Sequence, residues 1–257
     1  MARIVSTGKT ISLVEYHNKR VREKRKKLIW IFSGILVLLI ALVLVSRLSS
    51  FQIAKVKVEG AKVITNDEVE RNVLVTLAGS YFWLVPKGNA AFYPREEVRA
   101  SLMKEFPRFS SVGLNVEGEN TLRVLVTERE PYALYCPPAE EKCFFLDKEG
   151  FVFDEAPDFS GVVYFIYETE VPAEEFKNLS AFIENLSKLG FEPIRFEDYG
   201  LTMKNGSHMF LPEKSDLGKL FSSLELFLRS PAVEKDKLSE IDLRTENKIF
   251  WKTFGNN

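Results

Sequence analysis

Histidine and cysteine are scarce in this chain of 257 residues, which contains two of each. His17 lies in a basic N-terminal segment, so His208 is the only histidine in residues 46–257. A zinc site needs about four ligands, and one histidine with two cysteines does not supply them. A Ser–His–Asp arrangement would have to use His208, and no nucleophile-elbow motif accompanies it. The sequence therefore predicts no metal, no cofactor and no catalytic centre.

Phosphate-binding and metalloprotease motifs are missing as well. The chain has no Gly-rich phosphate loop and no H-E-x-x-H helix. The acidic pairs Glu96-Glu97 and Glu140-Glu141 are adjacent in sequence, so their side chains diverge instead of converging on one substrate. No aromatic residues interleave the basic run on a folded scaffold, which argues against nucleic-acid binding. We therefore expect a protein that is not an enzyme and takes no small-molecule substrate.

Only one long apolar run is present. Eighteen uncharged residues, 28–45, follow directly on the basic run 19–27. A helix of this length spans about 27 Å, close to the hydrocarbon thickness of a bilayer. Signal peptides have shorter apolar cores and a small-x-small cleavage site, which Val45-Ser46-Arg47-Leu48 does not provide. We predict an uncleaved transmembrane helix over 28–46 that contacts lipid through 28–45, with a cleaved signal peptide as the alternative.

The charge distribution predicts the orientation of this helix. Nine Lys and Arg residues against two acids give residues 1–27 a charge of +7. Since the whole chain carries −1 and the apolar run is uncharged, residues 46–257 carry −8. Basic residues near a span stay in the cytoplasm, and only Arg47 flanks the far end. We expect a single-pass protein of the cell membrane with a cytoplasmic tail, 1–27, and extracytoplasmic domains.

The two cysteines lie close together in the predicted outer region. Cys136 and Cys143 flank a segment that begins Pro137-Pro138, typical of a hairpin tip. Because an oxidising exterior permits disulfides, a Cys136–Cys143 bridge is favoured, with free thiols as the alternative.

The first outer segment, 47–130, has the pattern of a small two-layer domain. Thr65 and Glu68 form a capping-box pattern that predicts a helix start, and Pro94 is suited to the first turn of a second helix. Alternating apolar residues predict half-buried strands on either side of the helices. The expected order is β-α-α-β-β: strand 51–60, a helix from Thr65 to about Leu77, a helix from Pro94 to about Phe106, and strands 110–117 and 121–128.

The loop 79–88 between these helices is rich in aromatic residues. Tyr81, Phe82 and Trp83 are consecutive in it. We expect them to pack under the following helix, and contact with the membrane surface is the alternative.

The second outer segment, 131–257, has the pattern of a mixed, mostly antiparallel β domain with two helices. One helix follows Pro172 and ends at Gly190, a typical C-terminal stop, and the other begins at Ser215 or Asp216. The predicted strands are 133–135, 143–146, 151–153, 162–167, 191–197, 200–204, 207–211, 238–243 and 247–254. Together with the first domain, this predicts an α+β protein.

The last predicted strand, 247–254, is hydrophobic and β-prone. A strand at the edge of a sheet offers unpaired backbone groups to another chain, and strand addition is a known binding mode. Phe250, Lys252 and Phe254 share one face of the strand and Ile249 and Trp251 the other. We expect one aromatic set to face the core while Trp251 faces outward, so that the strand serves core and interface together.

The order of these parts resembles the FtsQ/DivIB family of bacterial cell-division proteins. The resemblance covers most of the chain from the basic tail onward, and a V-x-E-R-x-P-x-A string is its most specific match. The matching segments are Phe51–Gly60, Phe106-Pro107-Arg108, Val126–Ala133, Leu146–Phe153 and Ile241-Asp242-Leu243-Arg244.

The resemblance implies a non-enzymatic scaffold of the division septum. It implies a POTRA-type domain that contributes to recruitment, and a second domain whose end receives an FtsB/DivIC-type partner, itself bound to an FtsL-type protein. Thr245 stands where the family commonly has Tyr, which leaves backbone pairing as the expected contact. The implied partner-binding residues are Arg244, Lys248, Ile249, Phe250, Trp251, Lys252 and Phe254. A membrane-anchored cell-wall hydrolase using His208 and a ligand sensor with a pocket between the two domains are the alternatives.

Overall fold

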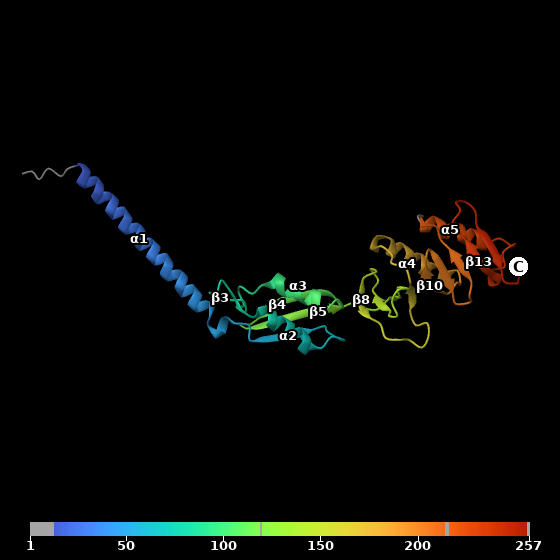
Figure 1. The fold of residues 1–257 in the computed structure, drawn as a ribbon, viewed down its shortest axis with the longest axis horizontal. Coiled ribbons are helices and arrows are strands. Elements are labelled where there is room, and N and C mark those ends of the chain that lie inside the picture. Colours follow the sequence, from blue (N-terminus) through green and yellow to red (C-terminus); the bar gives the residue numbers. More distant parts are fainter. Residues whose placement is uncertain (1–12, 119, 214–215, 256–257) are drawn as a thin grey trace, which may run out of the picture. The chain divides into compact units, whose positions relative to one another are not determined.

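The computed structural model describes residues 13–118, 120–213 and 216–255 (Figure 1). It is an α+β protein with five α-helices in this part. The chain divides into two compact units. The first contains the chain up to Leu102 and residues 112–126, and the second contains residues 103–111 and the chain from Thr127 onward. Residues 1–12 of the predicted basic tail lie outside the described residues, as does Ser215, one of the two predicted helix caps.

The N-terminal helix α1, Leu13–Ser46, contains both the end of the basic segment and the apolar run. Its part Val21–Ser46 is long and apolar enough to cross a membrane, and the apolar window within it is not buried inside the protein. The helix is thus compatible with a single-pass membrane anchor, although a signal sequence would meet the same criteria of length and composition.

The capping box predicted for the first outer helix is present. Helix α2, Asn66–Leu77, starts after Thr65, whose hydroxyl accepts a hydrogen bond from the backbone N–H of Glu68 at 3.4 Å. The Glu68 carboxylate in turn accepts from the backbone N–H of Thr65 at 3.0 Å. The apolar stripe of α2 is buried at Val69, Val73 and Leu77, as its spacing predicts.

The first unit contains a three-stranded sheet in the order β1-β5-β4, with β1 parallel to β5. The predicted sequence of strands and helices is observed, with one addition: a two-stranded hairpin lies inside the loop 79–88. The strand predicted over 51–60 is shorter than expected because a 3-10 turn precedes it. The elements are η1 (Ser49–Phe51), β1 (Lys55–Glu59), β2 (Ser80–Tyr81), β3 (Val85–Pro86), α3 (Arg95–Glu105), β4 (Phe109–Glu117) and β5 (Thr121–Glu128).

The second unit is built on a nine-stranded mixed sheet in the order β14-β13-β12-β11-β10-β9-β6-β7-β8. The predicted strand over 162–167 is wrong in its first half, because Val162 and Val163 are exposed and pairing starts at Phe165. The elements are β6 (Ala133–Tyr135), β7 (Phe144–Leu146), β8 (Val152–Glu155), β9 (Phe165–Tyr167), α4 (Ala173–Lys188), β10 (Pro193–Glu197), β11 (Gly200–Met203), β12 (His208–Phe210), α5 (Leu217–Leu228), η2 (Lys235–Lys237), β13 (Leu238–Asp242) and β14 (Phe250–Thr253).

Both helices of this unit cover the same face of the sheet. Helix α4 connects the parallel neighbours β9 and β10, and α5 connects the parallel neighbours β12 and β13. Both crossovers lead to the neighbouring strand in the same direction along the sheet, and their first strands, β9 and β12, run parallel to each other. Right-handed connections therefore place α4 and α5 on the same face of the sheet. Phe182 of α4 and Phe221 of α5 meet edge to face at 6.3 Å, above a core that contains Leu201, Met209 and Ile241.

A smaller apolar cluster lies at the other end of this sheet. Leu134, Phe145 and Phe153 form it, with Cys136 packed against them. Cys136 and Cys143 are joined by a disulfide that closes the connection between β6 and β7.

Candidate docking edge

Strand β14 is the outermost strand of the nine-stranded sheet, at the red, carboxyl-terminal end of the chain in Figure 1. It runs antiparallel to β13, with Lys252 opposite Glu240 and Phe250 opposite Asp242. Within 13–118, 120–213 and 216–255, β13 is the only strand that pairs with it. One side of β14 is therefore open to another chain.

The alternating direction of backbone N–H and C=O groups along β14 identifies the residues that face its open side. Phe254 donates its N–H to the carbonyl of Lys237, just before β13, at 2.8 Å. Because N–H and C=O groups point to opposite sides at successive strand residues, Lys252 and Phe250 also face β13. The N–H and C=O groups of Trp251 and Thr253 therefore point away from the sheet. A visiting strand would find its hydrogen-bond partners at these two residues.

The side chains of β14 lie differently from the prediction. Trp251 packs edge to face on Phe227 of α5, with ring centres 5.0 Å apart, and it pairs in register with the buried Ile241. Trp251 is thus on the helix-covered side, and the prediction that it faces outward is wrong. Phe250 lies on the opposite face, where it is 55% exposed. Both aromatic faces remain about half accessible.

Charged groups next to β14 form ion pairs with β13. The Arg244 guanidinium binds both carboxylate oxygens of Asp242, at 3.0 and 2.6 Å, and lies 4.8 Å from the centre of the Phe210 ring. This hydrogen bonding lowers the pKa of Asp242 below its usual value. Lys252 pairs with Glu240 at 2.9 Å. The uncovered face beside the edge is therefore polar with embedded phenylalanines.

The other predicted partner-binding residues lie at the two ends of this strand. Lys248 is exposed, and Ile249 is partly buried against the core of the unit. Phe254 is 50% exposed just after β14. The structure thus brings all the predicted residues to one edge of the sheet, on both of its faces.

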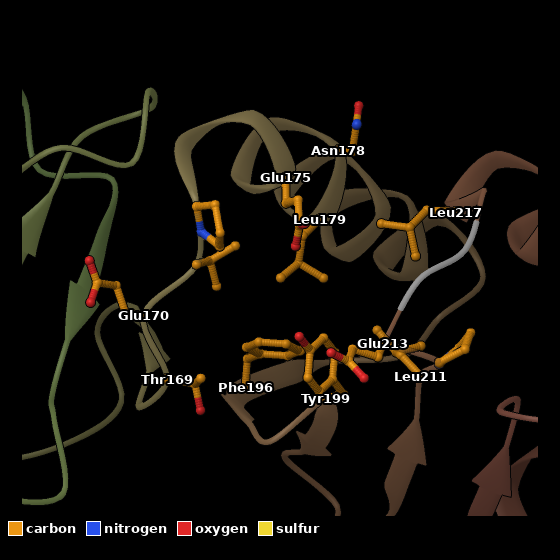
Figure 2. Close-up of a pocket in the computed structure, with 13 residues that line it drawn as sticks. Thr169, Glu170, Glu175, Asn178, Leu179, Phe196, Tyr199, Leu211, Glu213 and Leu217 are labelled. Carbon is orange, nitrogen blue, oxygen red and sulfur yellow. The ribbon is translucent and has the colours of Figure 1, made fainter.

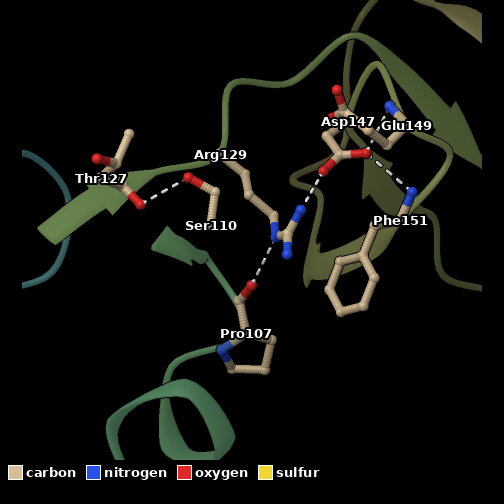
Figure 3. A network of polar contacts seen from close by, with 7 residues as sticks. All are labelled: Pro107, Ser110, Thr127, Arg129, Asp147, Glu149 and Phe151. Atoms are coloured by element: carbon tan, nitrogen blue, oxygen red, sulfur yellow. Dashed lines mark hydrogen bonds and ion pairs between the residues drawn. The ribbon is translucent and has the colours of Figure 1, made fainter. Parts of the chain in front are cut away.

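A buried polar network joins three of the segments that carry the family resemblance (Figure 3). Arg129 forms an ion pair with Asp147 and donates from Nε to the carbonyl of Pro107 at 3.2 Å. Its guanidinium carbon lies 4.0 Å from the centre of the Phe151 ring. Asp147 is 4% exposed, and its Oδ1 accepts the backbone N–H groups of Glu149 and Phe151 at 2.9 Å each. The side chains of Arg129 and Asp147 are 15% and 5% exposed, so this ion pair is largely buried inside the unit.

A second ion pair has the same construction. Arg108, which is 9% exposed, pairs with Asp154, and its guanidinium lies over the ring of Phe153 at 5.2 Å. The backbone N–H of Arg129 donates to the carbonyl of Arg108 at 2.7 Å, so the two arginine sites are adjacent. The strings that carry the resemblance contain Arg108, Arg129 and Asp147 but not Asp154, and they do not indicate which residues pair.

The solitary His208 lies at the start of β12. Its Nδ1 is 3.3 Å from the hydroxyl of Thr202, and the side chain is exposed. In the part of the chain that the structure describes, no group of three or more His, Cys, Asp or Glu residues is placed to hold a metal ion.

A cavity of about 270 Å³ lies inside the second unit (Figure 2). Glu175 and Leu179 of α4 point down into it, opposite Phe196 and Tyr199 near the turn between β10 and β11. Glu170 and Glu213 add two further carboxylates, so the cavity would suit a cationic group better than an anionic one. No local sequence pattern predicts this cavity, because its walls come from segments far apart in the chain.

Neither the protein-family models nor the curated proteins contain a match to this chain.

Proposed function

We propose that this chain is a bitopic scaffold of the bacterial cell-division machinery, which docks a partner protein on the open edge of β14. The observation that carries the proposal is the free side of this strand, where Trp251 and Thr253 present their backbone groups outward. In this proposal α1 spans the cell membrane with its basic end in the cytoplasm. The first unit serves as a POTRA-type recruitment domain outside the membrane.

The proposed partner is an FtsB/DivIC-type protein, itself bound to an FtsL-type protein at the septum. Its strand would add to β14 and extend the nine-stranded sheet. Phe250 and Phe254, both about half exposed, would supply the apolar side-chain contacts. Such pairing relies on the backbone. The hydrogen bonds between the added strand and β14 would therefore form even though Thr245 stands in place of the family's tyrosine.

A pull-down from membranes tests this proposal. A chain truncated after Arg244 lacks β14, and we expect it to lose the FtsB/DivIC-type partner that the intact chain retains, because the outward backbone groups go with the strand. Membrane fractionation and the proteolysis pattern of the first unit serve as controls and should not change. Equal recovery of the partner by both chains would contradict the proposal.

The hydrolase alternative has its own test. We expect a His208→Ala chain to support cell division as well as the parent, because His208 is exposed and its ring bonds to a threonine hydroxyl. A Thr202→Val chain is the matched control for that hydrogen bond. Division measured in cells that depend on the variant is the readout, and failure of His208→Ala alone would favour catalysis.

A further inference from the structure

The turn between β2 and β3 exposes two large aromatic side chains. Phe82 and Trp83 are each 91% exposed, more than any other large hydrophobic residue that the structure describes. The prediction that these residues pack under the following helix is therefore wrong for both. The turn projects these side chains away from the unit, so none of the first unit's described residues covers them.

The backbone of this turn is one that aromatic residues rarely adopt. Leu84 donates its N–H to the carbonyl of Tyr81 at 2.9 Å, which closes a β-turn. Both central residues are left-handed, with φ of 48° at Phe82 and 67° at Trp83. Turns of this kind, such as type I′, favour Asn-Gly, because a bulky residue with positive φ is strained. The aromatic pair thus costs stability here without adding any packing.

The turn is fastened to the end of the apolar helix. Arg47, the first residue after α1, donates from its guanidinium to the carbonyl of Trp83 at 2.8 Å and to that of Leu84 at 3.1 Å. The carbonyl of Ser46, the last residue of α1, accepts from the side chain of the buried Asn89 at 2.9 Å. These bonds place the turn at the level where the apolar helix ends.

Other exposed apolar residues come from the segments joined at this point. The backbone N–H of Ala90 donates to the carbonyl of Phe51 at 2.8 Å, which ties the 3-10 helix η1 to the loop before α3. The exposed apolar residues of these segments are Leu48, Phe51, Phe82, Trp83, Leu84 and Phe92. We call them the junction patch.

We propose that the junction patch, led by Phe82 and Trp83, inserts into the interfacial layer of the bilayer that α1 crosses. The proposal rests on Val21–Ser46 being a membrane span. Trp is enriched where headgroups meet the hydrocarbon core, and Arg47 at the same level can reach lipid phosphates while its stem stays in apolar surroundings. The patch is continuous with the end of the span, so the surface next to it is lipid. The turn would hold the first unit at a fixed depth on the membrane.

Depth-dependent quenching of Trp83 tests the proposal. The full chain, with Trp30→Phe and Trp251→Phe, is reconstituted into phosphatidylcholine–phosphatidylglycerol vesicles. We expect lipids brominated near the glycerol end of the acyl chain to lower Trp83 emission by roughly half or more, because indole rings settle at that depth. Emission should be blue-shifted and resist quenching by acrylamide. The matched control keeps Trp251 alone, which should respond to acrylamide and not to brominated lipid.

The outcomes separate lipid contact from the other readings. If carbonate extracts the chain from the vesicles, Val21–Ser46 does not span the bilayer, and the proposal fails with it. A carbonate-resistant chain whose Trp83 is quenched by acrylamide and not by bromine would overturn the proposal alone. A blue shift that appears only at high protein-to-lipid ratio would assign the patch to a second copy of the chain, which also overturns it.

A second variant guards against misfolding of the turn. Phe82→Asn with Trp83→Gly provides the residues that this turn prefers, so the hairpin should fold at least as well. We expect carbonate resistance to persist while amide hydrogen exchange in the vesicle-bound chain becomes faster at Tyr81 and Leu84. Unchanged exchange in that variant would count against membrane insertion of the patch.

Discussion

An Arg129→Met chain is expected to lose about 3–5 kcal/mol of stability in its second unit, because the substitution leaves a buried carboxylate without its cation. Asp147 is 4% exposed and cannot recover hydration without local opening. The variant also loses the hydrogen bond to Pro107 and the contact with the Phe151 ring. Met fills similar volume, so the effect would come mainly from charge.

Urea unfolding of the full chain in detergent, followed by Trp251 fluorescence, measures this loss. Trp30 and Trp83 are replaced by phenylalanine so that the signal reports on the second unit. A double variant, Arg129→Met with Asp147→Asn, should recover much of the stability, because Asn still accepts the N–H groups of Glu149 and Phe151.

A surface ion pair provides the comparison. Lys204 and Glu192 pair at 2.9 Å with side chains 72% and 68% exposed, so Lys204→Met should cost far less stability than Arg129→Met. If Arg129→Met costs no more than Lys204→Met, the buried ion pair does not stabilise the unit as its burial indicates.

Local sequence signals predicted the helices well because each signal acts within one or two turns. The capping box at Thr65 and Glu68 is formed as its spacing requires. Gly190 ends α4 with φ of 78°, where a side chain would be strained. Val69, Val73 and Leu77 recur every four residues and are the buried residues of α2. Such signals depend on neighbours along the chain, and the sequence lists those neighbours directly.

The sheet order and the hairpin could not be predicted in the same way. Strand pairing joins segments that are distant in the sequence. The residue pattern of β9 or β12 does not identify the strand that lies beside it. The β2–β3 hairpin was missed because Phe82 and Trp83 occupy a turn that normally uses Asn and Gly. The contact between Arg129 and Asp147 depends on two turns whose relative position only the folded chain defines.

The hydrophobic, β-prone sequence predicts the edge strand β14, which the structure contains, but its two faces are the reverse of those predicted. Alternation separates Phe250 from Trp251 without saying which of them meets the core. The pairing with β13 decides this, since it places Trp251 opposite Ile241 under α5. An irregularity in β13 between Leu238 and Glu240 shifts the register there, and no residue pattern in β14 reveals it.

A Thr253→Pro chain is expected to bind the proposed FtsB/DivIC-type partner roughly 10- to 100-fold more weakly. Proline removes the outward N–H of Thr253 and places its ring in the path of an added strand. The partner carbonyl that would have accepted this N–H is left unsatisfied. Since Thr253 donates nothing to β13, the domain's own sheet loses no hydrogen bond, and proline is tolerated on the solvent side of an edge strand.

Affinity measured with the full chain in detergent, against the partner's extracytoplasmic segment, gives the result. Thr253→Ala removes the side chain and keeps the N–H, so it should bind nearly as well as the parent. Lys252→Pro removes an N–H that points to β13, and it should destabilise β14 itself. If a Thr253→Pro chain has the parent's unfolding transition and binds at parental affinity, the partner recognises side chains at this edge and does not add a strand. The reason is that a proline at an outward position blocks strand addition.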